Sequence, residues 1–179
     1  MGYTREQLYE VANKPGQKKD TSFGYYRDPS SKRHSVTIKR MGKIIESVVG
    51  PTVLDCGCGA GLVSFLASQI DGVKEIHAID LQKSVLDVAR INLKNKNVTL
   101  HEGFVEELAF ESDYFNTVVM GEVIEHVYSV DKTLKEISRV LKKNGRLIMT
   151  CPYKGKLSKF HIRSISKSYL REKMEKYLT

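Results

Sequence analysis

The sequence lacks several features that would point to export or to a membrane. It has no tryptophan, only three cysteines and four prolines, and no long uninterrupted apolar run. A membrane-spanning helix needs about 20 mostly apolar residues, so we predict no membrane span. The opening residues MGYTREQLYE lack the apolar core of a signal peptide, which favours a cytoplasmic protein. Cys56 and Cys58 are separated by one residue and Cys151 makes the count odd, which favours reduced thiols over disulfides or a zinc site.

The chain has 179 residues, a length that suits one compact domain. Residues 4–12 are typical of a short helix, and residues 13–34 form a segment rich in Gly, Pro, Ser, Lys and Tyr. Such a long loop is unusual in a compact domain unless it is functional. We therefore divide the chain into residues 1–35, an N-terminal helix with an arm or lid, and residues 36–179, the domain that carries the site.

Short apolar runs alternate with amphipathic segments through the rest of the chain. This alternation predicts βαβ units, and therefore an α/β fold with a doubly wound, mostly parallel sheet. The expected strands are TVLDC, EIHAID, NVTLHEG, FNTVVMG and RLIMTC, and the expected helices are residues 35–49, 60–70, 84–93, 130–141 and 166–178.

The net charge of +8 is concentrated at the two ends of the chain. Residues 1–50 carry ten Lys or Arg against five Asp or Glu, and residues 151–179 carry eight against two. The middle segment is slightly acidic, with eleven against fourteen. Segregated basic charge suggests an anionic partner, such as RNA, a phosphorylated sugar or an anionic lipid.

A glycine-rich loop, LDCGCGAGL, joins the first strand to the next helix. Gly57, Gly59 and Gly61 occupy every second position, so the backbone can adopt positive φ and approach a ligand closely. Asp55 precedes the loop, and a carboxylate there favours an ammonium group over a pyrophosphate. The spacing G-x-G-x-G also differs from the G-x-G-x-x-G of dinucleotide folds, which disfavours a nicotinamide oxidoreductase.

Asp80 ends the second expected strand, nineteen residues after Gly61. A carboxylate at this position can accept hydrogen bonds from both hydroxyls of a ribose. A ligand with a ribose and an ammonium group but no pyrophosphate is S-adenosylmethionine.

These motifs resemble those of class I S-adenosylmethionine-dependent methyltransferases of the type 11 group. VLDCGCGAG, AIDL, EGFVEELAFESDYFNTVV, GEVIEHV and RVLKKNGRLIMTCP are similar to five successive family blocks. The resemblance implies a Rossmann-like sheet, here of five strands without the usual C-terminal antiparallel pair. The fifth strand would then be an open edge through which the chain could form an oligomer. The cofactor-binding residues implied are Asp55, Gly57, Gly59, Gly61, Asp80, Leu81, Phe104, Val105 and Gly121. Phe104 stands where the family often has Asp, so it would pack on the adenine or offer its backbone N–H.

The stretch GEVIEHV carries the candidate catalytic residues Glu122, Glu125 and His126. If a helical turn begins there, the three lie at i, i+3 and i+4 and share one face. The chain is similar to ubiquinone-pathway O-methyltransferases, which have such a block. It resembles RNA 3′-terminal 2′-O-methyltransferases more weakly, and in those enzymes the block and a later His hold a divalent metal. That resemblance implies a divalent metal on Glu122, Glu125, His126 and His161. Two carboxylates with two imidazoles would suit Mn, Fe or Zn better than Mg. Otherwise the block is a protein-only acid–base set, or a helix start.

The function that agrees with most features is methyl transfer from S-adenosylmethionine to a hydroxyl of a small-molecule or anionic acceptor. Metal assistance would lower the pKa of that hydroxyl. The alternatives are an RNA-modifying methyltransferase and a non-catalytic nucleic-acid-binding module, which the basic ends would suit.

Overall fold

A computed structural model describes residues 22–94, 96–152 and 164–178. Within these residues, five parallel strands form one sheet in the order β3-β2-β1-β4-β5. The predicted fold class, a doubly wound parallel sheet of five strands, is confirmed. The strands are β1 (Thr52–Cys56), β2 (Glu75–Asp80), β3 (Val98–Glu102), β4 (Phe115–Gly121) and β5 (Leu141–Thr150).

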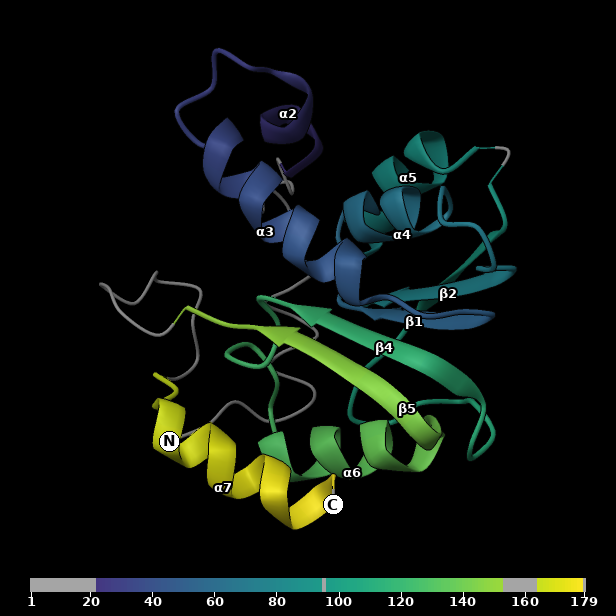
Figure 1. The fold of residues 1–179 in the computed structure, drawn as a ribbon, viewed down its shortest axis with the longest axis vertical. Coiled ribbons are helices and arrows are strands. Elements are labelled where there is room, and N and C mark those ends of the chain that lie inside the picture. Colours follow the sequence, from purple (N-terminus) through teal and green to yellow (C-terminus); the bar gives the residue numbers. More distant parts are fainter. Residues whose placement is uncertain (1–21, 95, 153–163, 179) are drawn as a thin grey trace.

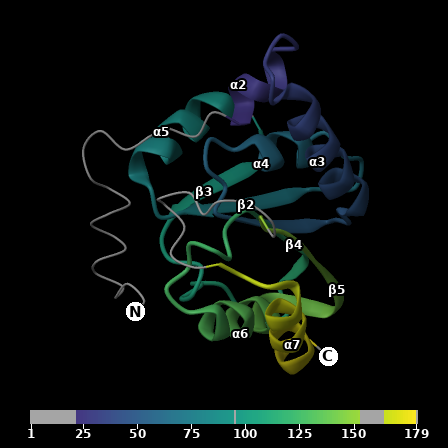
Figure 2. The same ribbon diagram turned by 90° about the vertical axis from the view of Figure 1, so that its left-hand side faces the viewer.

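Helices cover both faces of the sheet, as Figures 1 and 2 show. α3, α4 and α5 lie on one face, and α6 and α7 lie on the other. The helices are α2 (Ser22–Arg27), α3 (His34–Ser47), α4 (Leu62–Ala67), α5 (Lys83–Asn92), α6 (Val130–Val140) and α7 (Lys167–Tyr177). Among the described helices, none is long and apolar enough to cross a membrane.

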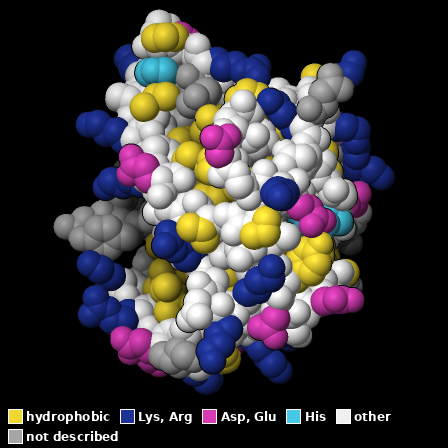
Figure 3. All heavy atoms as spheres, turned by 45° about the vertical axis from the view of Figure 1, so that its right-hand side comes forward, with side chains coloured by type: hydrophobic (Ala, Val, Ile, Leu, Met, Phe, Trp, Pro, Cys, Tyr) yellow, Lys and Arg dark blue, Asp and Glu magenta, His cyan; other side chains and the backbone are white. Residues whose placement is uncertain are grey.

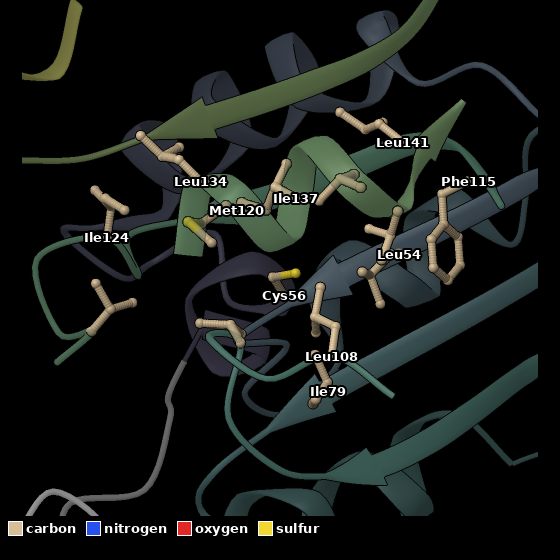
Figure 4. Packing of buried hydrophobic residues seen from close by; sticks show 14 of the residues in the cluster. Leu54, Cys56, Ile79, Leu108, Phe115, Met120, Ile124, Leu134, Ile137 and Leu141 are labelled. Carbon is tan, nitrogen blue, oxygen red and sulfur yellow. The ribbon is translucent and has the colours of Figure 1, made fainter. Parts of the chain in front are cut away.

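The larger part of the core lies between the sheet and α6 (Figure 4). Leu134 and Ile137 of α6 pack against Leu54 of β1 and Met120 of β4, and all four side chains are inaccessible to solvent. Leu134 and Ile137 share one face of α6 because they are three residues apart. Truncating one of them, for example Leu134→Ala, would cost about 2–5 kcal/mol.

The opposite face of the sheet packs against α3 and α4. Met41 and Ile44 of α3 join Val53 of β1 and Val119 of β4 in a second buried cluster. Val118 belongs to the first cluster because successive strand residues point to opposite faces. Through this packing α3 is held against β4, where that strand approaches the carboxyl edge of the sheet.

Two local predictions were wrong. Part of the expected loop, residues 22–27, is the short helix α2, whose Phe23 is buried and packs edge-on against Phe65 at a centroid distance of 5.5 Å. The fifth strand begins earlier than Arg146, the start of the predicted strand RLIMTC: β5 begins at Leu141, directly after α6 ends at Val140. The β4–β5 register then shifts between Phe115 and Thr117, and Asn144 has a φ of 65°.

The predicted helix at residues 4–12 and residue His161 lie outside the described residues. Within the described part of the chain, β5 pairs only with β4. The expected open edge is therefore present there, and an oligomer formed through it stays a prediction.

Candidate functional site

The site lies along the carboxyl edge of the sheet. All strand pairs are parallel, so the loops after β1, β2, β3 and β4 emerge on the same side. The strand order reverses at β1, which lies between β2 and β4. In open α/β sheets, ligands bind outside the carboxyl ends of the strands at such a switch point.

The glycine loop after β1 has the backbone that the sequence predicts. Gly57, Gly59 and Gly61 have φ angles of 68°, 53° and 87°. Residues with a side chain are strained in this region of φ. The N–H groups of Gly57 and Cys58 donate to the carbonyl of Ile79, at 2.7 and 3.0 Å. The loop is thereby fixed to the end of β2.

Asp55 is almost completely buried, with 2% exposure. Its Oδ2 accepts hydrogen bonds from the backbone N–H and the hydroxyl of Ser64, at 3.1 and 2.6 Å. This oxygen therefore ties the end of β1 to α4. That Asp55 also meets the ammonium of the cofactor stays a prediction.

Asp80 joins the first two loops of the edge. Its Oδ2 accepts the N–H of Gly59 at 2.8 Å, and its Oδ1 accepts the N–H of Gln82 at 2.8 Å. These two bonds hold the carboxylate at the end of β2, and that it also accepts ribose hydroxyls stays a prediction. The half-buried Leu81 follows directly.

The turn after β3 buries Phe104 and Val105. The Phe104 ring lies edge-on to Tyr128, with centroids 6.0 Å apart. Glu106 is 4% exposed, and its Oε1 accepts the N–H of Tyr128 at 2.6 Å. Burial raises the pKa of the Glu106 carboxyl, although this hydrogen bond opposes the shift. The Phe104–Glu106 segment is thereby tied to the turn after β4.

The expectation that Glu122, Glu125 and His126 share one helical face is wrong. Residues 122–127 form a turn, and α6 begins only at Val130. Glu122 has a φ of 60°, which no helix accommodates. The turn closes through a hydrogen bond from the His126 N–H to the Val123 carbonyl, at 2.8 Å.

The turn nevertheless gathers ionisable groups. The Glu125 side chain is 3% exposed, and its Oε1 lies 3.9 Å from Nε2 of the half-buried His126. Arg40 reaches from α3 to within 3.6 Å of Glu122. Burial raises the pKa of Glu125 to about 7, and Glu122 adds to the rise while the Arg40 charge opposes it.

The described residues do not by themselves make a metal centre. Among them, no group of three or more His, Cys, Asp or Glu side chains is arranged to hold a metal ion. The fourth predicted ligand, His161, lies outside the described residues. The four-residue metal site therefore stays a prediction.

Three neighbours of the turn were not predicted as site residues. They are Arg40 of α3, Thr150 at the end of β5, and Cys151 just after it. The Thr150 carbonyl accepts the N–H of Glu122 at 2.9 Å, and burial together with Glu125 and Glu122 raises the pKa of the Cys151 thiol. A helical repeat identifies Arg40 only as a surface cation, so the sequence carries no signal for its place beside Glu122.

The comparison with known families fits this geometry. A methyltransferase domain model matches residues 48–177. The chain belongs to this methyltransferase family. The family implies S-adenosylmethionine as the cofactor, and the glycine loop and Asp80 provide groups suited to it.

The curated relatives are also named as methyltransferases. A demethylmenaquinone methyltransferase from Lactococcus lactis is 32% identical over 127 residues, 66% of this chain and 49% of the relative. The methyltransferase YcgJ of Bacillus subtilis is 30% identical over 131 residues, 72% of this chain and 51% of the relative. A ubiquinone/menaquinone biosynthesis C-methyltransferase from Vibrio vulnificus is 34% identical over 105 residues, 56% of this chain and 40% of the relative. The chain spans about half the length of these relatives.

Solved structures share the fold. The crystal structure of YcgJ superposes with a TM-score of 0.71 at 24% identity, over 78% of this chain and 68% of that one. An S-adenosylmethionine-dependent methyltransferase from Mesorhizobium loti gives a TM-score of 0.56 at 18% identity, over 67% and 53%. The methyltransferase fold is therefore established independently of close sequence similarity.

Proposed function

We propose that this chain transfers a methyl group from S-adenosylmethionine to a small acceptor that carries a hydroxyl on a quinol-like ring. The observation that carries the proposal is the contact between two loops. A Cβ placed on Gly57 would overlap the side chain of Val123. The cofactor loop after β1 therefore lies directly against the turn that holds Glu125 and His126. This arrangement supports an acceptor held beside the cofactor.

The names of two relatives support the acceptor class, since one is a demethylmenaquinone methyltransferase and another a ubiquinone/menaquinone C-methyltransferase. A deprotonated phenol can react at its oxygen or at the neighbouring ring carbon. The resemblance to ubiquinone-pathway O-methyltransferases favours methyl transfer to the oxygen. The name of the second relative specifies transfer to carbon. Both outcomes use the same acceptor site, and the product distinguishes them.

The chain's own residues would act by position and charge. When bound, the cofactor supplies an activated methyl on a sulfonium, so the protein needs only to align it with the acceptor. Asp80 accepts the ribose hydroxyls, the glycine loop lets the cofactor approach the backbone closely, and Phe104 packs beside the adenine. Glu125 and His126 are the proposed groups for the proton of the acceptor hydroxyl. Glu122 holds Arg40 at the rim of the site.

The first test is calorimetric titration with S-adenosylhomocysteine and, separately, with NAD. We expect micromolar affinity for S-adenosylhomocysteine and no measurable affinity for NAD. The second test is transfer of a labelled methyl group to quinol and phenol acceptors, with mass spectrometry of the product. Tight NAD binding together with no response to S-adenosylhomocysteine would contradict the proposal.

Metal assistance is tested by the same transfer assay in the presence of a chelator and with His161→Ala. Loss of activity in chelator, restored by Mn or Zn, would support the metal predicted on Glu122, Glu125, His126 and His161. Full activity in chelator would leave the turn as a protein-only site.

The predicted anionic acceptor, including RNA, rests on the basic ends of the chain. On the face drawn in Figure 3, basic side chains are dispersed among acidic ones and do not form a single patch. RNA is therefore included among the acceptors in the transfer assay. RNA binding with a steep salt dependence and no methyl transfer would favour the nucleic-acid-binding alternative.

A further inference from the structure

Buried polar atoms without partners are concentrated at one place in the described part of the chain. They are Nε of Arg40, both carboxylate oxygens of Glu125, and Oγ1 of Thr150. Native structures leave few such groups unpaired, because each buried donor or acceptor without a partner costs about 1–3 kcal/mol. A cluster of them calls for an explanation.

The three residues come from distant parts of the chain, and each either contacts Glu122 or belongs to its turn, at the carboxyl ends of β4 and β5. Arg40 lies 3.6 Å from Glu122, and Glu122 is hydrogen-bonded to the backbone of Thr150 at 2.9 Å. Glu125 follows in the same turn, and its side chain is 3% exposed. The unpaired atoms therefore lie in one region, formed by α3, β5 and the turn after β4.

Gly121 keeps the space beside this cluster free of a side chain. A Cβ at Gly121 would lie 3.9 Å from Oγ1 of Thr150 and 3.9 Å from Ile44. Any larger side chain there would therefore approach the unpaired hydroxyl. The cofactor loop lies against the same turn, since Gly57 is against Val123.

We propose that Arg40, Glu125 and Thr150 form the recognition site for the acceptor, and that this site selects an uncharged ring carrying a hydroxyl together with a second oxygen. The inference rests on the proposed methyltransferase function and names its substrate class. The acceptor's O–H would donate to a carboxylate oxygen of Glu125. Its second oxygen would accept from Nε–H of Arg40 and from the hydroxyl of Thr150, which gives each of the three side chains a hydrogen-bond partner.

The local charge argues against a phosphate or another dianion at this position. Among the described residues, the guanidinium of Arg40 lies 3.6 Å from the Glu122 carboxylate, and the Glu125 carboxyl in the same turn is buried. A dianion would be repelled by the carboxylates and would lose its hydration on entry. A neutral phenol or enol avoids both costs.

The experiment measures binding of simple probes to the full chain, with and without saturating S-adenosylhomocysteine. Catechol, resorcinol and hydroquinone vary the spacing of two oxygens, and phenol paired with phenyl phosphate varies the charge. The variants are Arg40→Met, Glu125→Gln and Thr150→Val. The matched control is Lys39→Met, which removes an exposed cation from the neighbouring position of α3.

We expect at least one diphenol to bind more tightly than phenol, and phenol more tightly than phenyl phosphate. Each site variant should weaken diphenol binding about tenfold, equivalent to one hydrogen bond of roughly 1.4 kcal/mol, whereas Lys39→Met should leave it unchanged. Tighter binding of phenyl phosphate, equal affinity in all variants, or no diphenol binding at millimolar concentration would overturn the proposal.

Thermal unfolding separates recognition from a structural role. Thr150→Val replaces an unpaired buried hydroxyl with a methyl of similar shape, so it should raise the melting temperature while it weakens diphenol binding. A lowered melting temperature would mean that the hydroxyl supports the fold, and the proposal would be wrong.

Binding of S-adenosylhomocysteine and binding of diphenols are separate measurements, so the acceptor site and the methyltransferase function can fail independently. Normal S-adenosylhomocysteine affinity with no effect of the variants on diphenol binding contradicts only the acceptor site. Diphenol binding that depends on Arg40, Glu125 and Thr150, with no affinity for S-adenosylhomocysteine, contradicts the methyltransferase proposal and keeps the recognition site.

Discussion

The backbone N–H of Gly59 donates a 2.8 Å hydrogen bond to Oδ2 of Asp80. One carboxylate therefore fixes the cofactor loop and is also the predicted acceptor for the ribose hydroxyls. Because Oδ1 is bonded to the N–H of Gln82 at 2.8 Å, Asp80 holds two loops together before any ligand arrives.

Replacing Asp80 by Ala should weaken binding of S-adenosylhomocysteine by about 1–3 kcal/mol, because the ribose hydroxyls lose a charged acceptor. The same change should lower the melting temperature, since two backbone N–H groups lose their partner. Calorimetry and thermal unfolding measure the two effects. Asp87→Ala on α5, which removes an exposed carboxylate paired with Arg90, is the control. Unchanged affinity in Asp80→Ala would mean that the ribose binds elsewhere.

Gly59→Val should abolish cofactor binding, because a branched side chain at a φ of 53° distorts the loop and occupies the approach to the ligand. Gly72→Val is the matched control, since Gly72 also has a positive φ, 90°, and a Cβ added there would extend into open space. We expect both variants to lose stability and only Gly59→Val to lose affinity. Equal affinities would show that the loop does not contact the cofactor.

Gly57→Ala should destabilise the fold by more than about 1 kcal/mol, from the positive φ and the overlap with Val123. Val123→Ala removes the overlapping methyl groups, so in the double variant only the backbone strain of Gly57→Ala should remain. Denaturant unfolding of the four proteins gives the coupling energy. Additive losses would show that the two loops do not touch.

Glu106→Gln should raise stability at neutral pH, by about 1 kcal/mol for one buried carboxylate that keeps its N–H donor. The folded state raises the pKa of Glu106, chiefly through burial. The folded protein therefore holds this proton more tightly than the unfolded chain, and stability falls as pH rises from about 4.3, the ordinary Glu value, through the folded pKa.

The difference in melting temperature between Glu106→Gln and the unchanged protein should accordingly disappear below about pH 4. Glu111→Gln, in the exposed part of the same loop, reports the effect of removing a negative charge without burial. A stability difference that is independent of pH would show that Glu106 loses no free energy on ionisation in the fold.

Much of the architecture was determined by the sequence alone. Short apolar runs predicted all five strands and their parallel arrangement, because only buried strands joined by amphipathic helices produce that alternation. The glycine spacing after Asp55 and the position of Asp80 located the cofactor loop, since its conformation depends on residues that are local in the chain. The observed φ angles of Gly57, Gly59 and Gly61 agree with this expectation.

Only the tertiary structure decided the acceptor side of the site. The sequence suggested that Glu122, Glu125 and His126 shared a helical face, but the positive φ of Glu122 sends the chain into a turn, in which Glu125 is buried. Arg40 and Glu122 are 82 positions apart in the sequence, and their approach to 3.6 Å depends on α3 packing across the end of β4. No local propensity encodes such a contact, because it is set by the packing of Met41 and Ile44 against the sheet. Hydrogen-bond satisfaction is likewise a property of the folded chain, so the unpaired atoms of Arg40, Glu125 and Thr150 become visible only there.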